Sequence, residues 1–207
     1  MASVSALQSA YPALGRAFLA EVSAVAGRLS VDPFHLLAVI DFETAGTFDP
    51  SISNPNSSAV GLIQFVESTA QDLGTSTAEL ARMGRVEQMA YVERYLQPYA
   101  GRMRTVGDIY MAVLYPRAVG RAGSYVLFEQ GDGAYGANRG LDENGDGLVT
   151  KREAAARVRQ RLRGGQGGAG GGSPTLAGGG TNPLLLAAAV GLAATFLTTL
   201  FSTPTPS

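Results

Sequence analysis

Glu43 is the residue whose position in this sequence best suits acid–base chemistry. It lies at the end of the apolar run 33–44, and the turn-rich stretch AGTFDPSISN follows it. A carboxyl group at such a helix end is placed to line a cleft and to be partly removed from water. Burial raises the pKa of a carboxyl group, as a general acid that works near neutral pH requires. The alternative, an ordinary solvated glutamate, stays open on position alone.

A second chemical pattern is the stretch 142–153, D-E-N-G-D-G-L-V-T-K-R-E. Oxygen-bearing side chains stand at its first, third, fifth, ninth and twelfth positions, and a glycine stands at the sixth. This is the spacing of an EF-hand calcium loop. The sequence therefore predicts bound calcium, with ligands from Asp142, Asn144, Asp146, the carbonyl of Leu148, Thr150 (directly or through water) and Glu153.

The predicted calcium site is expected to be structural, not a switch. The residues before it are too glycine-rich for a regular entering helix, and the sequence contains no second loop of this kind. Another interpretation is a turn rich in Asp and Asn, in which Thr150 and Glu153 cap the helix that follows. The two interpretations are compatible, because a calcium-binding loop can also begin a helix.

The composition excludes several other kinds of chemistry. The chain has 207 residues, no cysteine and a single histidine, His35. It therefore has no disulfide framework, no thiolate nucleophile and no histidine-rich metal site. The formal net charge of −1 removes the case for a nucleic-acid partner bound through phosphate neutralisation, so none is expected.

Hydrophobic spacing predicts helices on both sides of Glu43. An amphipathic helix is expected over 14–30, and a second begins after the capping residue Asp32, with Pro33 at its first position. The second helix should end near Thr44. Later helices are expected at 68–72, 77–83, 86–99 and 106–115.

A small β lobe is expected beside this helix end. Gly, Pro, Asn and Ser in 45–65 rule out a long helix and allow short strands around Ile52 and at 61–65. Together with the helices, this lobe gives a mainly α (α+β) fold class for the domain 1–163.

Three motifs follow one another around Glu43. D-F-E-T-A-G-T-F-D-P begins at Asp41, S-S-A-V-G-L-I-Q-F begins at Ser57, and S-T-A begins at Ser68. With them, the stretch 33–120 resembles the soluble lytic transglycosylases of the goose-lysozyme-like fold, and phage and prophage members in particular.

In that family a Glu-Ser pair ends a helix, a GA-x-GLMQ segment forms the β lobe, and an Ala-Tyr-Asn segment closes the cleft. The segments that resemble these are 43–44, 59–64 and 114–116. The sequence departs from the family pattern at Thr44, Ile63 and Pro116, which replace Ser, Met and Asn. Pro116 removes a side chain that contacts substrate in the family.

The resemblance implies a lysozyme-like fold and cleavage of the β-1,4 bond between N-acetylmuramic acid and N-acetylglucosamine in peptidoglycan. Protonated Glu43 would donate its proton to the bridging oxygen. The Glu43 carboxylate would then accept the proton of the muramic C6 hydroxyl as a 1,6-anhydro ring closes. This chemistry needs one carboxyl group and no cofactor, so the calcium would serve structure alone.

A hydrolase of the usual kind needs a second carboxylate as base or nucleophile. The sequence offers two candidates, and neither is convincing. Asp41 is two residues from Glu43 and points elsewhere on a helix, and Asp49 suits a turn. A lytic transglycosylase is therefore favoured, with a hydrolytic muramidase or a non-enzymatic wall-binding virion protein as the alternatives.

The resemblance also supplies candidates for substrate binding. They lie at the helix end, in the β lobe and before the proline: Thr44, Ser57, Gln64, Phe65 and Tyr115. Tyr115 would hydrogen-bond Glu43 or the sugar, and Gln64 and Phe65 would shape the saccharide cleft. A purely structural role for these three residues is an equally open interpretation.

The C-terminal part of the chain differs chemically from the rest. The last 44 residues carry no charged side chain. Residues 164–183 include ten glycines and are predicted to form a flexible linker. The apolar stretch 184–201 is predicted to be a transmembrane helix, followed by a short tail, 202–207. The alternative for 184–201 is a hydrophobic helix buried against another virion protein or a second copy of the chain.

The N-terminus has no basic residue before Arg16 and no clean apolar core, so no secretory signal is expected. A peptidoglycan enzyme without such a signal needs another route to the cell wall. A phage virion that carries the protein into the envelope at infection provides one. We therefore expect a membrane-anchored virion component that acts on peptidoglycan in the periplasm.

Overall fold

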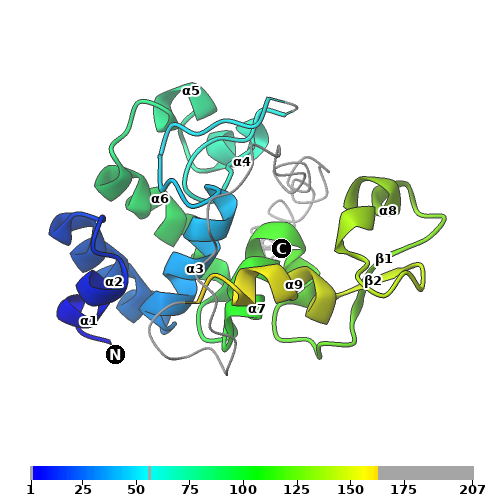
Figure 1. Cartoon of the computed structure of the whole chain (residues 1–207). Coiled ribbons are helices and arrows are strands. Elements are labelled where there is room, and N and C mark those ends of the chain that lie inside the picture. Colours follow the sequence, from blue (N-terminus) through cyan, green and yellow to red (C-terminus); the bar gives the residue numbers. More distant parts are fainter. Residues whose placement is uncertain (1, 56, 163–207) are drawn as a thin grey trace, which may run out of the picture.

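The computed structural model describes residues 2–55 and 57–162. The predicted linker at 164–183, the predicted membrane helix at 184–201 and the tail at 202–207 lie outside the described residues. The described chain is mainly helical with one small sheet, which confirms the expected fold class. Figure 1 shows its elements, namely α1 Val4–Ala10, α2 Arg16–Leu29, α3 Pro33–Glu43, α4 Glu67–Asp72, α5 Thr77–Leu80, α6 Arg85–Leu96, α7 Val106–Leu114, α8 Gly133–Asn138 and α9 Lys151–Arg159, with strands β1 Val126–Glu129 and β2 Leu148–Thr150.

The predicted helices α2 to α7 are all present, with small differences at their ends. The helix expected over 86–99 is α6 followed by a separate 3-10 turn, Gln97–Tyr99, because Pro98 ends the α-helical hydrogen bonding. Two short helices, α1 and α8, were not predicted. Ser3 caps α1, which buries only Leu7, so its hydrophobic pattern is too short to be recognised.

The prediction of strands near Glu43 was wrong. The segment around Ile52 and 61–65 forms only two isolated bridges, Ser53 to Val60 and Val60 to Phe65. Turns at Gly61 and Gln64, which both have positive φ, stop either bridge from growing into a ladder. The only sheet in the described residues is the antiparallel pair β1–β2, and β2 lies inside the predicted calcium loop 142–153.

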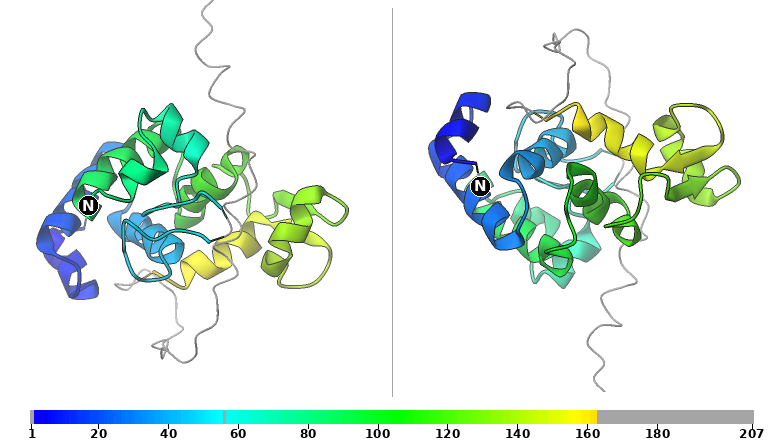
Figure 2. Two further views of the ribbon diagram at one scale, coloured as in Figure 1. Left: turned by 90° about the horizontal axis from the view of Figure 1, so that it is seen from above. Right: turned by 90° about the horizontal axis from the view of Figure 1, so that it is seen from below.

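Helix α3 lies at the centre of the fold. All of its residues except His35 are buried, as expected for a helix that is apolar on every side. It contacts α2, α7 and α9, and the last two also contact each other. Figures 1 and 2 show α4 to α6 on one side of α3 and the projection of α8, β1 and β2 on the other.

None of the helices in the described ranges is both long and apolar enough to cross a membrane by itself. The sharply bent pair α2 and α3 meets the length and composition criteria only when taken together.

A buried ion pair joins α7 to α9. Lys151 Nζ lies 2.5 Å from Asp108 Oδ1, and it also donates to the carbonyls of Ala118 and Arg121. Asp108 closes a capping box with Thr105 at the start of α7. Both charges of the pair are buried, so removal of either partner would leave an uncompensated charge. Because Lys151 begins α9 and Asp108 lies in α7, the pair holds the start of α9 against α7.

Candidate active site

The structure places Glu43 at the last position of α3, with 8% of the residue exposed. The helix starts at Asp32, whose side chain accepts from the backbone N–H of Phe34. It ends because Ala45 and Gly46 adopt positive φ, which breaks the helical hydrogen bonding. The predicted helix end at Thr44 is thereby confirmed, and the buried helix positions the Glu43 side chain.

Burial raises the pKa of the Glu43 carboxyl group from 4.5 to about 8. Among the described residues, no basic side chain forms an ion pair with it, and no hydrogen bond to it is formed. Nothing therefore offsets the loss of hydration, which penalises the charged form. At neutral pH the carboxyl group holds a proton that it can donate, and this is the state that a general acid needs.

Two other carboxylates near Glu43 in the sequence have structural partners. Asp41 is fully buried, and its Oδ1 accepts from Nη1 of Arg161 at 3.0 Å, which ties α3 to the chain beyond α9. Asp49 is exposed, and its Oδ1 accepts from both the backbone N–H and the hydroxyl of Ser51. The expected turn role of Asp49 is confirmed.

The hydroxyl group of Thr44 serves the backbone. It donates to the carbonyl of Ile40 at 2.7 Å and accepts from the N–H of Phe48 at 3.0 Å. Both bonds hold the reversal of the chain that follows Glu43. Thr44 was proposed from the sequence as a substrate contact. In the structure its only O–H donor is used within the protein, so its role is to position the chain after Glu43.

Two tyrosines outside the predicted set of site residues, Tyr95 and Tyr110, lie within the electrostatic reach of Glu43. Burial raises the pKa of both Tyr95 and Tyr110, and the Glu43 charge raises each pKa further. Tyr110 packs edge-on against Phe42 with ring centroids 5.3 Å apart. The four-residue spacing of the tyrosines on α6 was a weak signal for Tyr95, and nothing in the sequence indicated Tyr110.

Tyr95 also links the predicted cleft residue Phe65 to α7. Its hydroxyl donates to the carbonyl of Ala112 at 2.9 Å, and its ring meets Phe65 edge-on at 6.1 Å. Phe65 is 2% exposed. The structure therefore places Phe65 in the core beneath the site and not on an open wall.

Gln64 is buried and has an unusual backbone conformation for a residue other than glycine, with φ of +55°. Its Nε2 donates to the carbonyls of Gly61 and Ile52, while its Oε1 is buried without a hydrogen-bond partner. Within the described part of the chain, Gln64 therefore combines a backbone conformation that is rare outside glycine with a buried acceptor that has no partner. Ser57 is half-buried and its hydroxyl accepts from the N–H of Ala59.

Gln88 on α6 holds the turn that contains Gly61 and Gln64. Its Oε1 accepts from the N–H of Leu62 at 2.6 Å, and its Nε2 donates to the carbonyls of Pro50 and Leu80. A Cβ atom at Gly61 would lie 2.4 Å from Gln88 Oε1, so only glycine fits there. Nothing in the sequence indicated the role of Gln88, because its partners are backbone atoms.

Tyr115 is half-buried and follows the last residue of α7. Its ring packs edge-on against Phe128 of β1 with centroids 5.6 Å apart. Pro116 starts the 3-10 turn Pro116–Ala118.

The predicted calcium loop is closed by its own hydrogen bonds. The carboxylate of Asp142 accepts from the N–H groups of Gly145 and Gly147 and from the hydroxyl of Tyr135. Oxygens of Asn144 and Asp146 accept from backbone N–H groups two residues further on. This is the turn rich in Asp and Asn that the sequence offered as one interpretation.

At the end of the loop, Thr150 and Glu153 form the predicted capping box of α9. Only Oε2 of Glu153 takes part in it, and Oε1 is buried without a hydrogen-bond partner. In the described ranges no three acidic or histidine side chains converge closely enough to form a ready metal site.

Comparisons with known protein families, with characterised proteins and with solved structures find no match for this chain. The functional assignment therefore rests on the buried carboxyl group of Glu43, on the residues that surround it and on the resemblance in sequence. Of the residues proposed from the sequence, Phe65 is connected with Glu43 through Tyr95, which packs against Phe65 and whose pKa the Glu43 charge raises.

Proposed function

We propose that the protein is a peptidoglycan lytic transglycosylase that uses Glu43 as its only acid–base group. The observation that carries the proposal is the buried, uncompensated carboxyl group at the end of α3, with a pKa of about 8. The resemblance of 33–120 to soluble lytic transglycosylases supports it, and a lysozyme-like fold belongs to the same proposal.

In this reaction Glu43 first donates its proton to the oxygen of the glycosidic bond, and the C1–O bond of the muramic residue breaks. The Glu43 carboxylate then removes the proton of the C6 hydroxyl as that oxygen bonds to C1. The proton balance closes on one residue, and the product is a 1,6-anhydro sugar.

The occupied states of Asp41 and Asp49 favour this reaction over hydrolysis. A hydrolase needs a second free carboxylate as base or nucleophile. Asp41 is buried and forms an ion pair with Arg161, and Asp49 accepts a hydrogen bond from the backbone N–H of Ser51. Neither carboxylate is free to activate water beside Glu43.

The test is mass spectrometry of muropeptides released from purified peptidoglycan by the full chain. Products lighter by one water than reducing-end muropeptides are expected. Ordinary reducing ends would instead identify a muramidase. Absence of any product would favour the non-enzymatic virion protein.

We also propose that the loop 142–153 binds calcium as a structural ion. Its donor set is entirely oxygen, which suits calcium, and the buried Oε1 of Glu153 lacks a partner that a cation would supply. Asp142, Asn144, Asp146, the Leu148 carbonyl, Thr150 and Glu153 would hold the ion. Bound calcium would offset two of the three negative charges of Asp142, Asp146 and Glu153, and it would add nothing to the chemistry at Glu43.

Calcium at about one hundred times its dissociation constant is expected to raise the free energy of unfolding by about 2.7 kcal/mol. Urea denaturation with calcium and with a chelator measures this difference. Glu153→Gln should abolish it, because the twelfth ligand is lost. The exposed, non-ligating neighbour Glu143→Gln should retain it, and an equal calcium response in Glu153→Gln would contradict the assignment.

The place of action follows as part of the same proposal. The protein itself would be a virion component that is anchored in a membrane through 184–201. The linker 164–183 would join this anchor to the catalytic domain, which would act on peptidoglycan in the periplasm. The hydrophobic segment would be its contact with membrane, other virion proteins or a second copy.

A further inference from the structure

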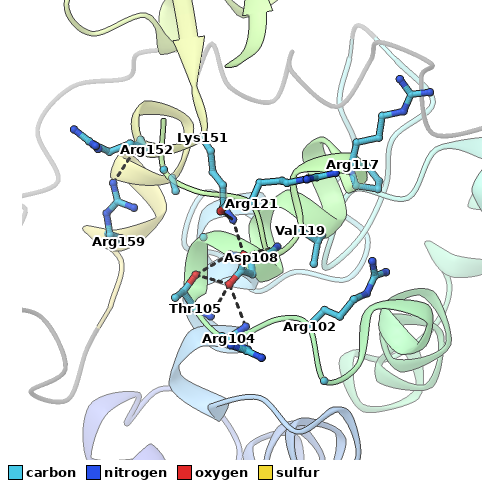
Figure 3. Close-up of a pocket in the computed structure, with 16 residues that line it drawn as sticks. Arg102, Arg104, Thr105, Asp108, Arg117, Val119, Arg121, Lys151, Arg152 and Arg159 are labelled. Carbon is cyan, nitrogen blue, oxygen red and sulfur yellow. Dashed lines mark hydrogen bonds and ion pairs between the residues drawn. The ribbon is translucent and has the colours of Figure 1, made fainter. Parts of the chain in front are cut away.

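A groove of about 980 Å³ lies between the segment that leads into α7, the segment that follows α7, and α9. It shares no lining residue with the candidate site at Glu43. Six arginines from these three parts of the chain line it, namely Arg102, Arg104, Arg117, Arg121, Arg152 and Arg159. Figure 3 shows Arg152 and Arg159 on one side of Asp108, and Arg102 and Arg117 on the other. We call it the arginine groove.

The arginine groove concentrates positive charge in a chain that is almost neutral. Lys151 and Asp108 also line it, so seven positive charges against one negative leave a formal charge of +6, while the whole chain carries −1. Asp108 and Lys151 neutralise each other in their buried pair. The charges of Arg102, Arg104, Arg121, Arg152 and Arg159 therefore have no counterpart in the lining.

All six arginines are exposed. Within residues 2–55 and 57–162, Arg104, Arg121 and Arg152 form no ion pair with a carboxylate, and the same holds for Arg102 and Arg159. Several are held in place by other contacts. Arg159 donates to the carbonyl of Arg152 at 2.6 Å, and Arg102 lies over the ring of Tyr99.

The side chains of the groove offer hydrogen-bond donors and almost no acceptors. A guanidinium group has five N–H donors and no acceptor. The only carboxylate, on Asp108, already accepts from Lys151, from Thr105 and from the N–H of Gly120. A ligand that matches this lining is rich in acceptors and poor in donors, as phosphate groups are and as peptides and sugars are not.

Two further properties of the groove limit the class of ligand that it can bind. The lining contains no aromatic residue, so it offers no platform on which nucleic-acid bases would stack. The groove is concave, which suits one thin chain better than a flat lipid surface or a duplex. We propose that the arginine groove binds a linear polymer of phosphate groups without bases, such as a polyphosphate or polyol phosphate chain. This proposal does not depend on activity at Glu43.

The test is binding of fluorescent inorganic polyphosphate of about 20 phosphates to the full chain, followed by anisotropy as the salt concentration rises. Each phosphate contact is expected to contribute about 0.7 to the slope of log affinity against log salt. Arg104→Gln with Arg152→Gln removes two exposed cations from the groove. The double variant should bind roughly 20-fold more weakly at about 0.1 M salt, with a slope smaller by about 1.4.

The matched control is Arg16→Gln with Arg82→Gln, which removes two exposed arginines outside the groove. It should bind polyphosphate within about twofold of wild type. No binding by wild type, or equal losses in both double variants, would overturn the proposal. Tighter binding of a thymidine oligonucleotide or of vesicles containing phosphatidylglycerol would also overturn it, since the partner would then be another class of molecule.

Discussion

Replacement of Glu43 with Gln is expected to slow the release of anhydro-muropeptides by at least about a thousandfold. Glutamine has the same shape as glutamate but can neither donate the acid proton nor accept the C6 hydroxyl proton. General acid–base catalysis contributes about 10² to 10⁴ to a rate, and both steps of the proposed reaction use this one group. The loss should appear in the chemical step, while binding of peptidoglycan is retained.

The matched control for this experiment is Asp49→Asn. Asp49 is an exposed carboxylate near Glu43 in the sequence, and its partner is Ser51 rather than the site. Its removal should leave the release rate within about threefold of wild type, since an exposed turn contributes little. Release by Glu43→Gln at the wild-type rate would contradict the assignment of Glu43.

The second large effect concerns stability. The pKa of Glu43 is about 8 in the folded protein and 4.5 when the group is fully hydrated. Between these values the folded protein holds the proton and the unfolded chain has released it. Stability therefore falls as the pH rises through this window, and it is fully present only below pH 4.5.

At about 1.36 kcal/mol per pH unit, this window corresponds to roughly 4 to 5 kcal/mol of lost stability. Glutamine at position 43 has no proton to lose. The free energy of unfolding of Glu43→Gln minus that of wild type should therefore be larger at about pH 9 than at about pH 4.5, by this amount. Urea denaturation of both proteins across this pH range measures the effect.

An exposed glutamate provides the control for the pH experiment. Glu87→Gln removes a carboxylate from the first turn of α6, where its effect is expected to stay below about 1 kcal/mol at any pH. If wild type and Glu43→Gln had the same pH dependence, Glu43 would titrate as a hydrated group. The proposed acid would then be charged at neutral pH.

The burial of Glu43 has opposite effects on the stability of the protein and on its proposed catalysis. Glu43 costs stability because its carboxyl group is buried without a partner, and the same burial keeps the proton that the reaction needs. A group that is unfavourable for folding and suited to catalysis is typical of an active site.

The sequence by itself determined the local features of this protein. Strong short-range signals predicted α3, from the cap at Asp32 to the end at Thr44, and therefore the position of Glu43 on the helix. The turn at Asp49 and the capping box of Thr150 and Glu153 were predicted for the same reason. In each case the residues that interact lie within a few positions of one another.

The tertiary structure alone decided what surrounds Glu43. Asp41 meets Arg161 across 120 positions, and Gln88 reaches Leu62 across 26. Neither contact leaves a periodic signal, because each joins elements whose packing is set by the whole core. The same reason explains why the sequence suggested Tyr115 as the partner of Glu43, whereas the fold packs Tyr115 against Phe128 and brings Tyr95 and Tyr110 within reach of the Glu43 charge.

The sheet and the arginine groove follow the same division. Strands were expected where β-compatible residues occur, but turns at Gly61 and Gln64 prevented a ladder, and β1 pairs instead with β2, which lies within the loop 142–153. The net charge of −1 did not indicate the arginine groove, because a net charge is a sum over the whole sequence. Binding of an anion depends on which charged side chains the fold places together. Arginines from three separate segments act together only because α7 and α9 pack against each other.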